Sequence, residues 1–375
     1  MLGSTGSIGE QTLDVVRARS DRFEIAVLTA CSNWQKLARQ AEEFAPDAVV
    51  IADERWYGDL REALAHLPVK VYAGTEAIEQ VVRGDSADVV VNALVGYAGM
   101  MPSLAAVETG KKLALANKES LVIAGKQIIE AADRNGAAIL PVDSEHSAIF
   151  QSLVGEVSPA RRLILTASGG PFLHTPKERL CEVTVEQALR HPNWSMGAKI
   201  TVDSSTMVNK GFEVIEAKWL FGVEADRIQV LVHPQSIVHS AVEFVDGSVK
   251  AQLGVPDMRM PIQYAFSYPD RLPLRGDRLN LYGKSLEFYE PDMRKFKCLA
   301  LAFDSIRKGG NMPCIVNAAN EVVNEAFRHD RCGFLQMADV IERTMNLVSF
   351  DASPDYDVYI QTDAEARRVA AQLLS

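Results

Sequence analysis

The feature that most constrains the fold is the regular alternation of short apolar runs with helical patterns over the first 140 residues. Candidate strands cover residues 24–30, 48–52, 69–73, 88–94, 112–116 and 137–142. Helical patterns lie between them at 34–44, 55–65, 76–83, 102–109 and 120–134. Because strands that alternate with helices pair in parallel, this order predicts an α/β fold with a doubly wound, Rossmann-like sheet.

A glycine-rich turn opens the chain, with Gly3, Gly6 and Gly9 spaced G-x-x-G-x-x-G before an apolar-periodic helix. Glycines at such positions permit a tight turn and a close approach of a diphosphate, and the helix N-terminus favours negative charge. The turn therefore predicts a dinucleotide site. Only Met1 and Leu2 precede it, although their strand would be the central one, so we expect the natural sequence to begin further upstream.

The choice of dinucleotide is normally set about 20 residues after the glycines, where a carboxylate holds a ribose hydroxyl. Residues 29–33 contain no carboxylate, and Lys36 follows one turn later, so a 2′-phosphate would not be repelled. This pattern favours NADPH. The loops at 96–99 and 117–120 follow later strands and should lie beside the nicotinamide. Lys118 in the second loop has two interpretations: a functional residue, or a solvated lysine paired with Glu119.

Two carboxylates one residue apart, Asp143 and Glu145, end the apolar run 140–142. In an extended segment they point to the same side, and at about 4 Å they repel by roughly 4 kcal/mol at an effective dielectric near 20. A shared proton, a basic neighbour or a metal ion would offset this. The alternative is a helix start, with Asp143 or Ser144 as the N-cap and Glu145 in the first turn.

The middle of the chain contains two segments suited to an anionic ligand. A strand at 163–167 runs into Ser168-Gly169-Gly170, whose backbone N–H groups form an anion-binding nest. The irregular stretch 190–197, with His191 and Trp194, predicts a lid hinged at Gly197. A buried structural tryptophan is the alternative for Trp194.

A third acidic group lies in a helix expected over 204–217. Asn209, Lys210 and Glu213 are spaced to project from neighbouring turns of it. If Glu213 meets Asp143 and Glu145, the site is an all-oxygen one for Mg²⁺ or Mn²⁺, and Lys210 stays free to hold a phosphate.

The remaining patterns define the later domains. A strand at 228–232, then a hairpin of 238–245 and 248–253 around Asp246-Gly247, predict a mixed sheet able to form a dimer surface, with His233 and His239 structural. Helical patterns at 297–308, 314–327, 333–348 and 363–374 predict a small bundle, with residues 317–321 packing on the catalytic domain. The expected domains are a nucleotide-binding domain (1–143), a catalytic domain (144–268), a linker (269–295) and a C-terminal helical domain (296–375).

Composition excludes several classes of protein. The net charge of −10 without a long basic stripe argues against nucleic-acid binding. No apolar stretch approaches the length of a membrane span, and no leader pattern opens the chain, so we expect a soluble, unexported protein. The five cysteines form no C-x-x-C pair, which argues against a disulfide framework and a thiolate zinc site and fits reduced thiols in the cytoplasm.

Several strings together resemble one enzyme family. GSTGSIG (3–9), ANKESL (116–121), PVDSEHSAIFQSL (141–153), SGGPF (168–172), RHPNWSMG (190–197) and VDSSTMVNKGFEVIEA (202–217) are similar, in the same order, to the motifs of 1-deoxy-D-xylulose 5-phosphate reductoisomerases. The resemblance implies a homodimeric enzyme that uses NADPH and Mg²⁺ or Mn²⁺ to convert 1-deoxy-D-xylulose 5-phosphate into 2-C-methyl-D-erythritol 4-phosphate, early in non-mevalonate isoprenoid synthesis. Residues Cys31-Ser32 depart from the family, where Gly-Lys is frequent.

The resemblance also implies roles for individual residues. The metal ligands would be Asp143, Glu145 and Glu213. The cofactor contacts would be Thr5, Gly6, Ser7, Ile8, Asn33, Asn117, Glu119 and Gly197. The substrate contacts would be Lys118, Ser144, Glu145, Ser168, His191, Trp194, Met196, Ser204, Asn209, Lys210 and Glu213, the serines with Asn209 and Lys210 being around the phosphate and Trp194 and Met196 in the lid. Lys118, Glu145 and His191 are the catalytic candidates.

Two other functions remain open at this point. A metal-free, two-domain oxidoreductase acting on a sugar or semialdehyde would keep its activity in a chelator. A non-catalytic dinucleotide sensor would bind the cofactor without oxidising it in the presence of substrate. The order of bond breaking in the rearrangement, and the groups that move protons, stay open as well.

Overall fold

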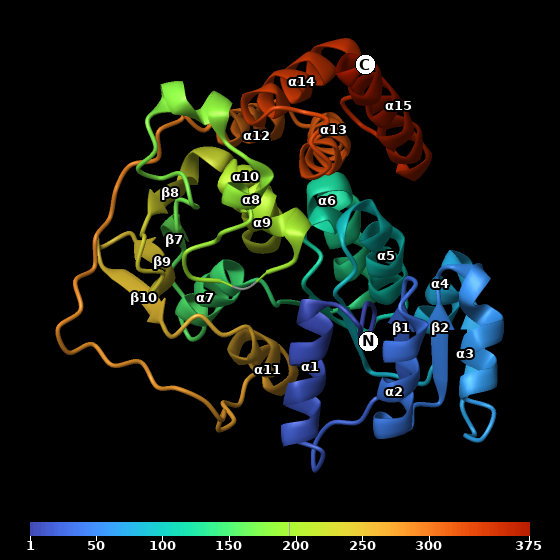
Figure 1. The fold of residues 1–375 in the computed structure, drawn as a ribbon. Helices are drawn as coiled ribbons and strands as arrows, with labels where there is room; N and C mark the ends of the chain where they lie inside the picture. Colours follow the sequence, from blue (N-terminus) through green and yellow to red (C-terminus); the bar gives the residue numbers. More distant parts are fainter. Residues whose placement is uncertain (195) are drawn as a thin grey trace. The chain divides into compact units, whose positions relative to one another are not determined.

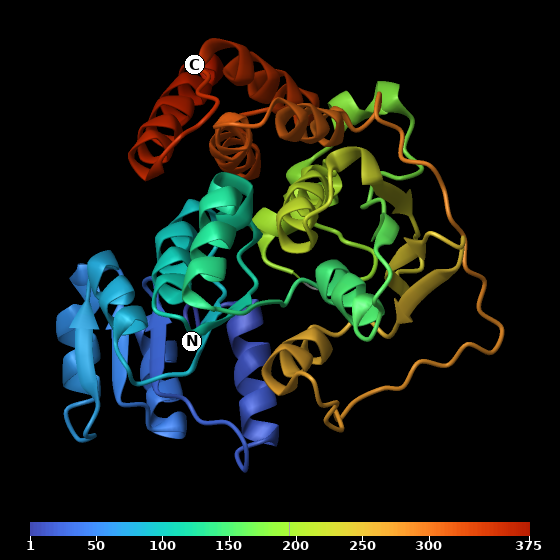
Figure 2. The same ribbon diagram turned by 180° about the vertical axis from the view of Figure 1, so that it is seen from behind.

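The computed structural model describes residues 1–194 and 196–375, and Figures 1 and 2 show its ribbon from opposite sides. The helices are α1(Ser7–Ala18), α2(Trp34–Phe44), α3(Tyr57–Ala63), α4(Thr75–Arg83), α5(Met100–Glu108), α6(Lys118–Asn135), α7(Ser144–Leu153), α8(Val185–Ala188), α9(Ala198–Ser205), α10(Val208–Phe221), α11(Arg259–Ser267), α12(Lys297–Lys308), α13(Met312–Arg328), α14(Phe334–Leu347) and α15(Tyr356–Leu374). The strands are β1(Val27–Ala30), β2(Ala48–Ile51), β3(Lys70–Ala73), β4(Val89–Asn92), β5(Lys112–Leu115), β6(Ile139–Pro141), β7(Ala160–Ala167), β8(Ile228–Val232), β9(Val238–Phe244) and β10(Val249–Leu253). Short 3-10 helices are η1(Glu54–Trp56), η2(Gly96–Gly99), η3(Lys177–Glu182) and η4(Ala225–Arg227).

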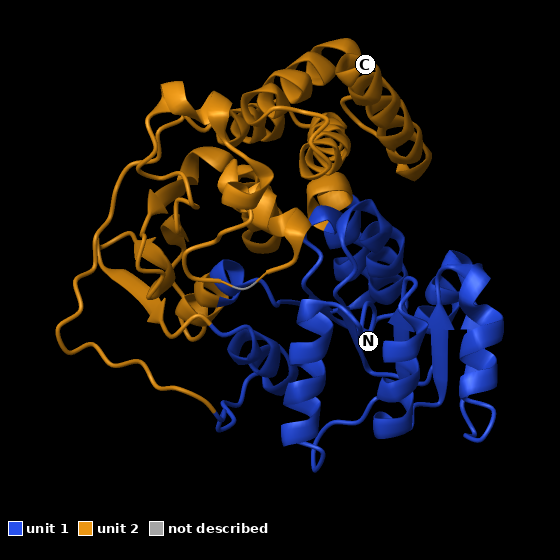
Figure 3. Cartoon of the chain, in the orientation of Figure 1, with its two compact units in different colours: residues 1–120, 127–147, 257–275 blue, residues 121–126, 148–256, 276–375 orange. Residues whose placement is uncertain are grey.

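The chain divides into two compact units, coloured separately in Figure 3. Unit 1 comprises residues 1–120, 127–147 and 257–275, and unit 2 comprises residues 121–126, 148–256 and 276–375. Helix α6 contributes to both units, and its backbone leaves helical geometry at Ala124. The side chain of Trp219 would lie 2.2 Å from a Cβ at Gly125, so only glycine fits there.

Unit 1 contains the parallel sheets expected from the alternating pattern. One has the order β1-β2-β3 and the other the order β4-β5-β6, and every pairing within them is parallel. Buried Leu28, Val49 and Ile51 pack with Leu37 of α2 and Leu60 of α3 in one apolar core. The first part of the fold prediction is confirmed.

The first four residues occupy the position between the two sheets of unit 1. The backbone of Met1 and Ser4 exchanges hydrogen bonds with Thr29 of β1, whereas Leu2 bonds to Val91 and Ala93 beside β4. Leu2 also forms an isolated parallel bridge with Asn92. These bonds give the spatial order of a classical doubly wound sheet, with residues 1–4 as its short central strand.

Unit 2 combines a mixed sheet with a helical C-terminal region. The sheet has the order β10-β9-β7-β8, where β7 and β8 are parallel and the other pairs antiparallel. Helices α12 to α15 gather at one end of this unit in Figures 1 and 2, and buried side chains of α12, α13 and α14 share a core with Phe212 of α10. The expected hairpin and helical bundle are both present.

One predicted helix is broken in two. The expected helix over 204–217 is instead the end of α9 followed by α10, because Met207 adopts a left-handed conformation with φ 59°. A non-glycine residue in this region carries backbone strain, and such residues cluster at functional sites. The break separates Ser204 from Asn209, Lys210 and Glu213, which all belong to α10.

None of the described helices is long and apolar enough to cross a membrane.

Candidate functional site

The glycine turn is fixed by contacts that leave no room for side chains. A Cβ at Gly9 would lie 2.4 Å from the carbonyl oxygens of Gly3 and Ser4, and one at Gly3 would lie 2.7 Å from the oxygen of Ala93. Gly6 is the N-cap of α1, and no side chain caps this helix start. The turn therefore presents the first N–H groups of α1, at Ser7 and Ile8, where a diphosphate can accept them.

Helix α2 holds the glycine turn from the side. The Lys36 ammonium donates to the carbonyl oxygen of Thr5 at 3.0 Å and pairs with Glu10 at 2.5 Å. Gln40 exchanges hydrogen bonds with the hydroxyl and carbonyl of buried Ser4. Asn33, a predicted cofactor residue, is the N-cap of α2. Lys36 thus braces the turn, in addition to supplying positive charge near it.

The second predicted cofactor segment is built around Asn117, which caps α6. Its side-chain oxygen accepts the N–H of Ser120, and its amide donates to the carbonyls of Leu94 and Gly96 at 2.9 Å. The same amide lies 3.3 Å from the Glu119 carboxylate. Asn117 thereby ties the loop after β4 to the start of α6, which positions Lys118 and Glu119.

Lys118 does not form the solvated pair with Glu119 that was the alternative reading. Its ammonium lies 2.5 Å from Oδ2 of Asp143, and both side chains are nearly buried. The pair joins the start of α6 to the end of β6. The carboxylate pair of the D-x-E motif therefore has a basic neighbour inside unit 1, which is one of the three expected ways of offsetting its repulsion.

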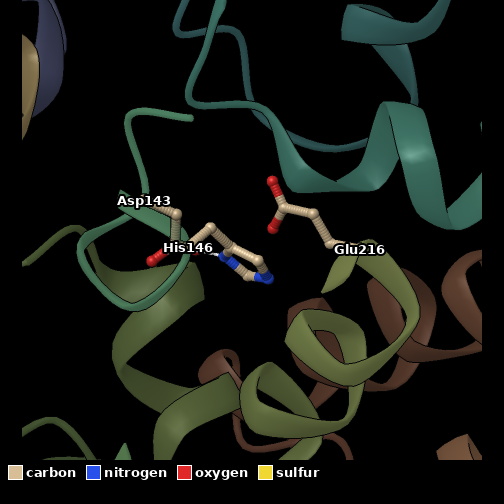
Figure 4. A group of neighbouring side chains, drawn as sticks. All are labelled: Asp143, His146 and Glu216. Carbon is tan, nitrogen blue, oxygen red and sulfur yellow. Dashed lines mark ion pairs between the residues drawn. The ribbon is translucent and has the colours of Figure 1, made fainter. Parts of the chain in front are cut away.

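The D-x-E segment itself begins helix α7. The carbonyl of Asp143 accepts the N–H of Ser147, and the Ser144 hydroxyl donates to Glu145 at 2.5 Å. His146 is fully buried, and its Nδ1 lies 3.9 Å from Oδ2 of Asp143. Figure 4 draws both side chains. Both sequence interpretations hold together: the segment starts a helix, and Asp143 also has the basic neighbour Lys118.

Helix α10 of unit 2 contributes the third predicted metal ligand. The Asn209 amide donates to Glu213 at 2.5 Å, and the Lys210 ammonium pairs with the other oxygen of the same carboxylate. Lys210 and Glu213 are buried. Lys210, which we expected to stay free for a phosphate when a cation is bound, pairs with Glu213 in this structure, since a buried carboxylate requires a charge partner.

A second set of potential ligands escaped the sequence reasoning. His146 and Glu216, both fully buried, each stand three residues beyond a predicted ligand on a helix, and Figure 4 labels them with Asp143. The i, i+3 spacing of Asp143 with His146, and of Glu213 with Glu216, was visible in the sequence. That repeated spacing was the signal that could have found them.

The predicted anion nest follows β7. Gly169 and Gly170 have φ of 84° and 67°, and the Ser168 hydroxyl accepts the N–H of Gly170 at 3.2 Å. The same hydroxyl lies 3.0 Å from Nε2 of His191. A Cβ at Gly170 would lie 2.9 Å from the carbonyl oxygen of Ser204, so nest and α9 are in direct contact. The structure thus brings Ser168, His191 and Ser204 together within unit 2.

The predicted lid segment borders a pocket of about 620 Å³ in unit 2, lined by Ser168, Gly170, Arg179 and Arg190 among others. His191 Nδ1 accepts the N–H groups of Asn193 and Trp194, and the Asn193 amide donates to Pro234 and Ser236. The Trp194 ring is half-buried, and its centroid lies 6.1 Å from that of the His239 ring. Met196 is also half-buried. Gly197 is the N-cap of α9. Ser195 of the predicted lid lies outside the described residues.

Family models match three consecutive parts of the chain. They describe a 1-deoxy-D-xylulose 5-phosphate reductoisomerase over residues 1–125, the C-terminal domain of that enzyme over 139–221, and a DXP reductoisomerase C-terminal domain over 253–369. Reductoisomerases of Bacteroides fragilis and Bacteroides thetaiotaomicron are 58% and 57% identical to the whole chain, over 97% and 96% of their own lengths. The chain belongs to this family.

Solved reductoisomerase structures agree in fold with the chain. The enzyme of Zymomonas mobilis, in complex with NADPH, aligns with a TM-score of 0.93 and 43% identity over the whole chain and 98% of its own. A reductoisomerase in complex with NADPH, fosmidomycin and magnesium aligns with a TM-score of 0.95 and 39% identity, over the whole chain and 97% of its own. The fold of this chain is therefore the fold of the reductoisomerase family.

Proposed function

We propose that this chain converts 1-deoxy-D-xylulose 5-phosphate into 2-C-methyl-D-erythritol 4-phosphate with NADPH and a divalent metal ion, in non-mevalonate isoprenoid synthesis. The observation that carries this proposal is the succession of family matches through both units, with relatives more than half identical over their full length. The chain is an NADP-dependent oxidoreductase.

We assign the cation to Asp143, Glu145 and Glu213. The resemblance to the family implies these ligands: unit 1 supplies Asp143 and Glu145, and unit 2 supplies Glu213. Three carboxylates suit a hard ion such as Mg²⁺, which prefers oxygen, whereas an imidazole favours softer transition metals. When bound, the cation supplies Lewis acidity toward the substrate's ketone and neighbouring hydroxyl oxygens.

The two lysines beside these carboxylates, Lys118 and Lys210, each have an ion pair in this structure and a proposed role toward the substrate. Lys118 pairs with Asp143 and Lys210 with Glu213, so each lysine neutralises a ligand where no cation does so. With a cation held by the carboxylates, both ammonium groups would be available to the substrate. Lys118 then donates to the substrate's oxygens and Lys210 to its phosphate, which are the roles that the resemblance implies.

The nucleotide site fits NADPH at the glycine turn. The uncapped start of α1 receives the diphosphate through the turn of Thr5, Gly6, Ser7 and Ile8. The end of β1, at Cys31 and Ser32, is exposed and carries no carboxylate, so a 2′-phosphate meets no repulsion there. Asn117 and Glu119 hold the loop beside the nicotinamide.

Most of the groups that we assign to the sugar phosphate belong to unit 2, where Ser168 contacts His191 and the nest contacts α9. The Ser168 hydroxyl, the N–H groups of the nest, Ser204 and Asn209 receive the phosphate, together with Ser144. His191 donates through Nε2, because its Nδ1 accepts two backbone N–H groups. In this tautomer His191 orders the lid and holds Ser168. Trp194 and Met196 close over the substrate and exclude water from its reacting carbonyl group.

The protein functions as a homodimer in the cytoplasm. The outer strand β10 is exposed over most of its length, including Val249 and Leu253, which suits an interface between copies. All five cysteines are free thiols, as expected of a reducing compartment.

The decisive experiment follows NADPH absorbance with 1-deoxy-D-xylulose 5-phosphate, with and without Mg²⁺. We expect oxidation that requires the cation and is abolished by a chelator. Glu213→Gln should lose most activity, whereas Glu224→Gln, an exposed carboxylate just beyond the same helix, should retain it. Chelator-resistant turnover would favour the metal-free oxidoreductase, and cofactor binding without turnover would favour the sensor; either result contradicts the proposal.

A further inference from the structure

A buried carboxylate at the end of the lid segment is held by the C-terminal helices. Asp203 of α9 is 1% exposed. Its Oδ1 accepts the amides of Asn320 at 2.9 Å and Asn324 at 2.8 Å, both from α13. Its Oδ2 pairs with Lys199 of α9 at 2.9 Å. Three donors on one carboxylate form a specific clamp between α9 and α13 rather than general packing.

The clamp acts at both ends of α9. The Asn324 amide also donates to the backbone carbonyl of Lys199, in the first turn after Gly197. Asp203 itself immediately precedes Ser204, whose carbonyl oxygen is in contact with Gly170 of the anion nest. Because α9 is only eight residues long, fixing these two points fixes its position. The contacts of α13 therefore reach the nest through a single short helix.

We propose that Asp203, Asn320 and Asn324 are positioning residues that fix α9, and with it Ser204 and the nest of Ser168 to Gly170, in the geometry that binds the substrate's phosphate. This inference rests on the proposed function. The C-terminal helical region thereby takes part in phosphate binding without touching the substrate. Asn320, one of the polar residues of the segment 317–321, thereby acquires a role beyond packing.

The surroundings of Asp203 make the clamp sensitive to charge. The ionisable groups facing it are Lys199 on its own helix and the thiol of Cys298 on α12, whose pKa burial raises to about 12, with the Asp203 charge as the second cause. Arg328 of α13 donates to the side-chain oxygen of Asn324 at 2.8 Å. The side-chain oxygen of Asn320, by contrast, is buried without a hydrogen-bond partner among the described residues.

The substitution Asn320→Asp tests the clamp with almost no change in size. An ionised carboxyl at this position faces Asp203 without a cation of its own, so it repels Asp203 and displaces α9. Burial and the adjacent Asp203 charge raise the pKa of the introduced carboxyl, so it protonates as the pH falls, donates a hydrogen again and restores the contact. We expect KM for the sugar phosphate to rise about tenfold at about pH 8 and to return toward the wild-type value near pH 6. We expect kcat and the Kd for NADPH to change less than about twofold.

Asn317→Asp is the matched control. Asn317 is equally buried on α13, but its amide donates to Glu321 and does not contact α9. It should leave the pH dependence of KM unchanged. Asn324→Ser is a second, milder variant that shortens a donor to Asp203, and it should raise KM with no recovery at low pH.

The outcomes separate the clamp from a merely structural role. The inference is wrong if Asn320→Asp raises KM but also lowers kcat, NADPH affinity and melting temperature. It is also wrong if the KM of Asn320→Asp follows the wild-type pH profile. If Asn320→Asp does not fold, an unchanged KM in Asn324→Ser overturns it as well. Failure of the proposed function is distinguishable, because then the wild-type chain itself shows no turnover with this substrate.

Discussion

The ammonium of Lys118 lies 2.5 Å from the Asp143 carboxylate, with side chains 7% and 11% exposed. Lys118 begins α6 after the cap of Asn117, and Asp143 follows β6, so neighbouring parallel strands bring the two together. The pair explains how unit 1 holds an acidic D-x-E motif without a cation. The lysine thus neutralises the charge of Asp143.

Replacing Lys118 should make the protein depend on the cation for stability. In Lys118→Met the nearly buried Asp143 loses its partner, and removing one member of a buried pair costs about 3–5 kcal/mol. We expect the metal-free variant to melt at a lower temperature and Mg²⁺ to raise its melting temperature more than that of the wild type. Turnover should fall about 100-fold, since a donor to the substrate is lost. Calorimetry with and without Mg²⁺ measures the first effect.

Lys112→Met provides the control for this measurement, because Lys112 is an exposed lysine on β5 of the same sheet. Its melting temperature should respond to Mg²⁺ as the wild type does. An equal response in Lys118→Met would show that Lys118 does not compensate the ligand charge.

The glycine turn should tolerate no side chain at Gly9. The Cβ of Gly9→Ala would lie 2.4 Å from two carbonyl oxygens, so the turn must open, at a cost of about 1–3 kcal/mol. We expect NADPH affinity, measured by nucleotide fluorescence, to fall at least about tenfold because the α1 N–H groups move away from the diphosphate. Gly58→Ala in α3, where nothing lies within 4 Å of the new Cβ, should bind normally and gain about 0.5 kcal/mol. Normal NADPH binding by Gly9→Ala would contradict this account.

Local patterns predicted most of the elements because each depends on neighbouring residues. Helices α2 and α12 have the expected bounds, since their apolar periodicity and flanking residues agree. The break at Met207 could not be foreseen, because a left-handed methionine is stable only where surrounding packing imposes it. The helical spacing of the apolar residues Val208, Phe212 and Ile215 predicted one continuous helix.

Charge partners were harder to predict than the charges themselves. Lys210 and Glu213 are three residues apart on a helix, so the sequence showed that they could pair, but not that burial makes pairing obligatory. The donors to Asp203 come from more than 100 residues further along the chain. Contacts over such a separation follow from the tertiary packing of α13 on α9. The expected domain boundaries at 143, 268 and 295 stay predictions.

The two ring nitrogens of His191 should have separable roles. Nδ1 accepts the N–H groups of Asn193 and Trp194, whereas Nε2 contacts Ser168. An asparagine oxygen can replace Nδ1 and a glutamine amide can replace Nε2. We expect His191→Gln to shift Trp194 emission toward that of an exposed indole, and His191→Asn to preserve it while raising KM. Subtracting the spectrum of Trp194→Phe isolates this signal. An unshifted emission in His191→Gln would show that Nδ1 does not order the lid.

The ladder between β7 and β9 should lose stability in acid through Glu243. A hydrogen bond from Arg162, its cross-strand partner, lowers the pKa of Glu243, and Arg161 adds to the effect. Because the folded-state pKa is depressed, this contribution is fully present above the unfolded-state value of about 4.3 and is lost as the pH falls through the folded-state value. Urea unfolding should therefore show that the free energies of unfolding of wild type and Glu243→Gln differ by a constant amount between about pH 6 and pH 8, and that this difference shrinks below about pH 4.

Arg162→Met removes the main cause of the pKa shift and should weaken the same acid dependence. Adding Glu243→Gln to Arg162→Met should then change the free energy of unfolding little. A difference between wild type and Glu243→Gln that persists unchanged into acid would mean that the ion pair, although formed, does not couple protonation to folding.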